Sequence, residues 1–212
     1  MKQGLGILIL TSALAPFAAG FAGNDPAGAI NTELGNSTAA AKEAYYSGLR
    51  ALRKAQAYEA EAAKASAPEK SAKSREKALS SYKESIAPLI DAISIQPTLY
   101  QAWQCLGVAD LRLGNFEDSA SAYTKVLELR PNYPEATEGR AEAYLGLNMV
   151  DEAKSAYLAL AGSSPKLADE LMAVMHRWLN DHPRGAQDLS AAEVQAFAKW
   201  VNEGGVKASV TN

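Results

Sequence analysis

Apolar residues recur at three- and four-residue steps along most of the chain, which is the spacing of one helical face. The pattern predicts a long helix over residues 39–65, a second over 69–95, and two shorter helix–turn–helix units that end at Pro131 and Pro165. Pro68 separates the first two helices, because proline lacks an amide donor and disfavours helix at the preceding residue. The expected fold class is all-α.

The second long helix contains a proline in its interior. Its apolar face is formed by Tyr82, Ile86, Leu89, Ile90 and Ile93. A proline inside a helix is a common cause of sharp bends. We therefore expect Pro88 to kink this helix or to split it in two.

Two more helices are predicted after Pro165. Ser164 is the expected N-cap of the first, with Pro165 at its first position. Its apolar residues are Leu171, Val174, Met175, Trp178 and Leu179. After a loop over 180–187, the sequence from Ser190 to Glu193 forms a capping box for the last helix, and Gly204 with Gly205 ends it.

The segment 100–131 carries a dense set of motif residues. These are Trp103, Leu106 and Gly107 at the spacing W-x2-L-G, Gly114 at a turn, Tyr123 in the second helix and the closing Pro131. Closing prolines recur at Pro97, Pro131 and Pro165, so each step is 34 residues (131 − 97 and 165 − 131). In motif and period, the chain resembles the tetratricopeptide repeat (TPR) family.

The resemblance implies a short right-handed α-solenoid of about three repeats. The unit 98–131 matches best, and 132–165 keeps Tyr144, Ala153, Tyr157 and Pro165 at pattern positions. The unit 39–97 is degenerate: with Tyr45 at position four, its closing proline is expected at residue 73, so 24 extra residues (97 − 73) require longer helices or an inserted hairpin. Residues 166–203 are expected to be capping helices and 204–212 a loose tail.

The N-terminal residues predict export. Lys2, an apolar run and small residues near position 22 are typical of a cleaved signal peptide over 1–22, followed by a flexible leader over 23–38. The run is shorter than the ~20 residues that a membrane-spanning helix needs, which favours a periplasmic or secreted protein. An uncleaved anchor is the alternative.

Composition narrows the function. The 212 residues are 48% apolar and 21% charged with a net charge of −3, which fits a globular chain without an affinity for nucleic acid. The single cysteine, Cys105, excludes an internal disulfide and is expected to be a packed residue. His176 and His182 have no partners at ligand spacing, and no nucleophile, phosphate loop or cofactor motif is present. We expect no enzyme, metal or cofactor.

The resemblance also implies a groove that binds a protein or peptide segment. Family positions two, five, nine, twelve and thirteen correspond to Gln101, Gln104, Val108, Leu111, Arg112, Glu135, Glu138, Glu142 and Leu145, with Gly146 at the last. A looser register for the first unit adds Glu43, Tyr46, Arg50, Arg53 and Lys54, giving a groove that is basic at one end and acidic at the other. Ordinary solvated helix faces are the alternative interpretation.

Two functions are compatible with these sequence features. The first is an exported scaffold that holds a partner segment, in an envelope assembly or as a chaperone. The second is a structural component that associates with itself.

One prediction concerns the stability of the fold. Trp103→Ala is expected to lower the free energy of unfolding by on the order of 3–5 kcal/mol, as the truncation of a buried aromatic residue.

Overall fold

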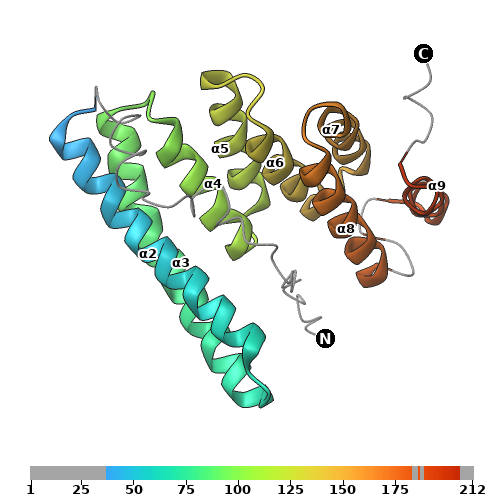
Figure 1. Cartoon of the computed structure of the whole chain (residues 1–212), viewed down its shortest axis with the longest axis horizontal. Helices are drawn as coiled ribbons and strands as arrows, with labels where there is room; N and C mark the ends of the chain where they lie inside the picture. The colour runs from blue at the N-terminus through green and yellow to red at the C-terminus, as the bar shows by residue number, and fades with distance from the viewer. Residues whose placement is uncertain (1–36, 183–185, 187–188, 206–212) are drawn as a thin grey trace, which may run out of the picture.

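The computed structural model describes residues 37–182, 186 and 189–205 (Figure 1). Within these ranges all the regular structure is helical, which confirms the all-α prediction. The helices are α2 (Ala39–Lys64), α3 (Pro68–Ile95), α4 (Tyr100–Leu113), α5 (Phe116–Leu129), α6 (Pro134–Gly146), α7 (Val150–Ser163), α8 (Pro165–Asp181) and α9 (Ala191–Asn202). The predicted signal peptide, nearly all of the leader and most of the tail lie outside the described residues.

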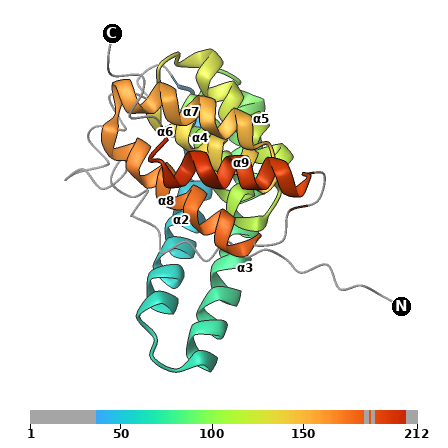
Figure 2. The same cartoon turned by 90° about the vertical axis from the view of Figure 1, so that its right-hand side faces the viewer.

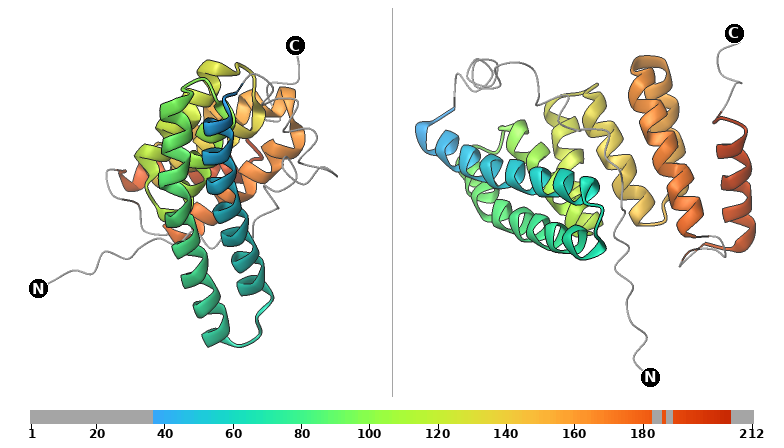
Figure 3. Two further views of the ribbon diagram at one scale, coloured as in Figure 1. Left: turned by 90° about the vertical axis from the view of Figure 1, so that its left-hand side faces the viewer. Right: turned by 60° about the horizontal axis from the view of Figure 1, so that its bottom comes forward.

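The helices stack as successive pairs. Each helix packs against the next one along the chain, from α2 to α9. The first helices of neighbouring pairs also touch, because α4 contacts both α2 and α6, and α6 contacts α8 (Figure 3). Since α8 meets α6 as α6 meets α4, it takes the place that the first helix of a further repeat would have.

The first pair is a long hairpin. Its helices α2 and α3 have 26 and 28 residues, against 13 or 14 in α4 to α7. The hairpin therefore projects beyond the rest of the array (Figures 1 and 2). Small side chains, among them Ala55, Ala62 and Ala78, are buried and allow the two helices to approach closely. Longer helices, rather than an inserted hairpin, accommodate the extra residues of the first unit.

The predicted division of α3 at Pro88 is wrong. The helix runs without a break from Pro68 to Ile95. Leu89 and Ala92, in the turn that follows the proline, are fully buried, so their packing holds the helix together where one backbone hydrogen bond is missing. A buried Ser85 hydroxyl also donates to the Tyr82 carbonyl at 2.7 Å.

The centre of the array is organised around Tyr123, which is 1% exposed. A Cβ atom on Gly107 would lie 3.1 Å from its ring, and one on Gly139 would lie 2.3 Å from its Cζ atom. The ring of Tyr123 in α5 thus fits against glycines of α4 and α6. This contact explains the glycine of the W-x2-L-G motif and gives Gly139, which sequence reasoning overlooked, an equal role.

Trp103 differs from its prediction. It is half-buried, and it packs at the border of the core cluster while its Nε1 donates to the Pro97 carbonyl at 2.8 Å. The loss expected from Trp103→Ala is accordingly below the range for a fully buried aromatic residue. The tryptophan that is fully buried is Trp178 in α8, which packs edge-on against Phe197 with ring centroids 5.6 Å apart.

Most of the predicted helix ends are observed. Gly114 ends α4 in the left-handed conformation (φ 80°), and Asn148 (φ 62°) occupies the equivalent place after α6. Ser190 and Glu193 form the predicted capping box. Ser164 precedes α8, but its side chain makes no capping hydrogen bond, so that detail was wrong. The loop predicted from residue 180 begins after Asp181.

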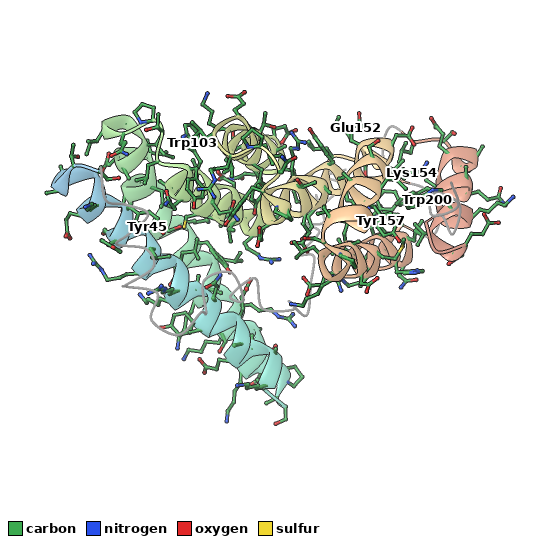
Figure 4. All side chains as sticks on the ribbon, turned by 45° about the horizontal axis from the view of Figure 1, so that its top comes forward. Tyr45, Trp103, Glu152, Lys154, Tyr157 and Trp200 are labelled. Carbon is green, nitrogen blue, oxygen red and sulfur yellow. The ribbon has the colours of Figure 1, made fainter. Side chains whose placement is uncertain are left out.

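The remaining motif residues are divided between the core and the surface. Leu106 and Ala153 are buried, Tyr144 and Tyr157 are half-buried, and Pro131 and Pro165 are exposed at helix boundaries. Tyr157 packs edge-on against Trp200 of α9 at 5.4 Å, and Lys154 lies 5.7 Å from the Phe197 ring (Figure 4). Through these aromatic contacts α9 packs against the end of the array.

We predict opposite effects for two glycine substitutions. Gly139→Ala should destabilise the chain by about 1–3 kcal/mol, because the new methyl group overlaps the Tyr123 ring. Gly162→Ala, in a helix with nothing within 4 Å of the new atom, should stabilise it by about 0.5–1 kcal/mol. Chemical denaturation of both variants measures the difference, and equal effects would show that the close approach is absent.

Candidate functional site

The predicted groove positions lie on the face formed by the first helices α2, α4, α6 and α8, which we call the first-helix face. Its apolar members Val108, Leu111 and Leu145 are at most 7% exposed and belong to the hydrophobic core. This is a correction, because these side chains pack against neighbouring helices and do not line an open groove. The polar positions of the same face carry its charged and hydrogen-bonding groups.

The polar members form a recessed strip. Gln101, Gln104, Glu138 and Glu142 are 6%, 1%, 5% and 9% exposed. Arg112, Glu135 and Gly146 are half-buried. A Cβ atom on Gly146 would lie 2.4 Å from the Phe116 ring, so this position serves packing between helices. These residues are therefore much less exposed than the prediction of an open groove implies.

Glu138 and Glu142 are one turn apart on α6. Burial raises the pKa of Glu138 to about 8, helped by the nearby carboxyls of Glu142 and Glu170 and opposed by Arg112. Burial also raises the pKa of Glu142, against the effect of Arg112 and Arg177. Each carboxyl is therefore easier to keep protonated than an exposed one.

Arg112 joins three repeats electrostatically. Burial lowers its pKa, but the carboxylates of Glu142 on α6 and Glu59 on α2 raise it by more, so the guanidinium stays charged. The hydroxyl of Tyr82 on α3 also lies in the field of Glu59 and Arg112. We name the whole group the inner polar cluster, consisting of Glu59, Tyr82, Arg112, Glu138, Glu142, Glu170 and Arg177.

Four members of this cluster were not predicted. Glu59 depends on the long hairpin: a helix with the 14 residues of α4, begun at Ala39, would end at Leu52, before Glu59. Tyr82 lies on α3, the second helix of the same hairpin. Glu170 and Arg177 come from α8, for which the sequence pattern predicted only a capping role. Their separation of seven residues places them on one face of that helix, and this was the available signal.

Several buried polar atoms near this face lack a hydrogen bond within 3.5 Å. They include both amide atoms of Gln104 and Arg177 Nε. Buried polar groups in proteins are nearly always hydrogen-bonded. In the described chain these enclosed atoms gather close to the first-helix face.

The basic residues predicted to form one end of the groove are exposed and lie outside the inner polar cluster. Arg50, Arg53 and Lys54 on α2 are exposed. Arg50 pairs with Glu43 at 3.5 Å and Lys54 pairs with Glu84 at 3.4 Å. Exposed ion pairs of this kind are worth little, so this end fits the interpretation as a solvated helix face.

The cysteine and the two histidines do not form a reactive or metal-binding site with other described residues. Cys105 is fully buried, and burial raises the pKa of its thiol to about 12, which suits a packed residue and not a nucleophile. His176 is exposed, while the His182 ring stacks on Trp178 at 4.4 Å. No group of three potential metal-binding side chains occurs in the part of the chain that is described. None of the described helices is long and apolar enough to cross a membrane.

A second surface feature lies on the side of α5, α6 and α7. It is an open hollow of about 590 Å³ whose lining includes Thr137, Arg140, Tyr144, Glu152 and Ser155. Arg140 lies 5.7 Å from the Tyr144 ring and reaches Thr124 Oγ1 at 3.4 Å. The charged groups of this hollow are accessible to water and partly paired, so substitutions there are suitable as control variants.

We predict that stability falls as pH rises from about 4.5 to about 8. Because the pKa of Glu138 is higher in the folded chain, the folded state holds a proton that the unfolded state releases in this interval. Glu138→Gln should flatten the profile and stabilise the chain at pH 8 by on the order of 1 kcal/mol or more. Urea unfolding at a series of pH values measures this, with the exposed Glu152→Gln as control. Parallel profiles for wild type and Glu138→Gln would contradict the buried carboxyl.

Comparison with known families agrees with this architecture. The family model described as "Tetratricopeptide repeat" matches residues 100–133, which span α4, α5 and the turn that follows. The comparison with curated proteins finds no match. Residues 100–133 are thus a tetratricopeptide repeat, and the helix pairs on either side stack on it as the units of an α-solenoid do.

Proposed function

We propose that the chain is an exported, non-catalytic scaffold that binds a segment of a partner protein on the first-helix face. In this role it would be a component of an envelope assembly or a chaperone. Repeat arrays of this kind use the extended surface of successive repeats for binding. The observation that carries the proposal is the inner polar cluster, where charged and hydrogen-bonding groups of α2, α4, α6 and α8 converge with unmet capacity.

Export and the absence of catalysis rest on sequence. The support for export is the positive, apolar and small-residue pattern of the first 22 residues. The support for a non-catalytic role is the lack of a paired nucleophile and base in the sequence, together with the inert setting of Cys105.

Gln104 offers a clean test of partner binding. Its amide is enclosed in the free chain with both atoms unpartnered, so a bound segment that pairs with it must displace the side chains that cover it. Gln104→Leu should lower the affinity for a partner about tenfold, the equivalent of about 1.4 kcal/mol. The chain should nevertheless stay as stable as wild type, because replacing an unsatisfied buried amide by an apolar group is nearly neutral or favourable.

The partner for this experiment is obtained by crosslinking and affinity capture from the exporting cell, and its affinity is then measured with purified components. Ser155→Ala, in the hollow beside α7, is the matched control. Equal binding by wild type and Gln104→Leu would contradict the proposed site. Charge reversal of Glu138 or Glu142 is unsuitable, because a change of charge at residues that are at most 9% exposed alters folding stability as well as binding.

Self-association is the second candidate, and one observation favours it. Ile90 and Ile95 on α3 are each 47% exposed, and Ile95 lines an open hollow of about 610 Å³ between α2 and α3. A second copy would cover this apolar surface. Sedimentation at high protein concentration separates the two functions, since a purely monomeric chain excludes self-association as its role.

A further inference from the structure

The side chains of Glu138 and Glu142 are unusually well buried for acidic residues. Their residues are only 5% and 9% exposed. Among the ion pairs within 4.0 Å that the described residues form, none involves either carboxyl. Acidic residues are rarely buried without a close partner, because removing the charge from water is costly. The two carboxyls thus lie in a recessed place without a cation in direct contact.

The inner polar cluster is also short of positive charge. It contains four carboxyls, those of Glu59, Glu138, Glu142 and Glu170, against the guanidinium groups of Arg112 and Arg177. Lys166 pairs with Glu170 at 3.4 Å, but its side chain is 76% exposed and faces solvent. Burial favours the protonated form of Glu138 and Glu142 in the free chain.

An independent observation points to a ligand at the same place. Gln104, at the equivalent position to Glu138 one repeat earlier (138 − 104 = 34), is 1% exposed and leaves both amide atoms without a hydrogen bond. The Tyr82 hydroxyl lies in the same cluster, close to Glu59 and Arg112. Amide and carboxyl oxygens together form a set of hydrogen-bond acceptors.

We propose that the segment bound on the first-helix face carries a lysine or arginine whose cationic group lies between Glu138 and Glu142. This inference rests on the proposed function and specifies the chemistry of the partner. A lysine ammonium has three donors and an arginine guanidinium five, so either can use several of these acceptors at once. Hydrogen bonds between a cation and carboxylates are the stronger kind, and the recessed site protects them from water.

Binding of the cation is coupled to proton release. The carboxyls deprotonate as the positive side chain arrives, and their protons pass to the solvent. Affinity should therefore rise as pH increases from about 6 to above 8, the range in which Glu138 loses its proton. The charged and titratable groups that face the pair are Glu135 on α6, Glu170 and Arg177 on α8, Arg112 on α4, Glu59 on α2, Tyr82 on α3 and Tyr123 on α5.

The test selects binding peptides from a random dodecapeptide phage library on the purified chain at pH 8.5. Wild type should enrich peptides with lysine or arginine at one fixed position, and replacing that residue by glutamine should weaken binding at least tenfold. The double variant Glu138→Gln/Glu142→Gln should lose this preference and the rise of affinity with pH. Glu152→Gln, exposed beside α7, is the control and should keep both. Thermal unfolding verifies that each variant folds.

The outcomes separate this inference from the proposed function. Selected peptides that bind wild type and are weakened by Gln104→Leu, but show no basic position, would overturn the inference and leave the proposed site standing. A basic preference that survives in the double variant would overturn it as well. If Gln104→Leu weakens none of the selected peptides, the proposed binding face itself is wrong.

Discussion

The structure depends on the close approach of α4 and α6 around the Tyr123 ring. Glycines at 107 and 139 make room for this ring, and a methyl group at either position would crowd it. The same approach brings Glu138 and Glu142 of α6 beside Arg112 of α4 and shields all three from water. Packing and electrostatics are thus linked: the contact that joins the second and third repeats also creates the acidic site between them.

The lengthened first repeat completes this site. Glu59 lies in the part of the hairpin beyond the length of an ordinary repeat helix, and with Tyr82 of α3 it acts on Arg112. At the other end, α8 adds Glu170 and Arg177 while it closes the array. The two departures from a regular repeat therefore converge on the same inner polar cluster.

Periodicity was sufficient to predict the helices, their pairing and the capping box at Ser190, because these follow from local rules of spacing and hydrogen bonding. The predicted split at Pro88 does not occur, because tertiary packing of Leu89 and Ala92 outweighs one missing bond. The family resemblance placed Val108, Leu111 and Leu145 in a groove, although neighbouring helices bury them. Glu59 and Arg177 could not be found from the repeat pattern, since they lie outside the regular units and meet Arg112 and Glu142 only in three dimensions.

The protonation of Glu138 decides whether the recessed site is held neutral until a cation arrives. The most direct measurement is a ¹³C NMR titration of the glutamate carboxyls, with Glu138→Gln to assign the resonance. We predict that Glu138 titrates near pH 8 in the free chain, because burial raises its pKa to about 8. A titration near the ordinary glutamate value of about 4.3 would contradict this, because the carboxyl would then be charged and solvated at neutral pH without any partner.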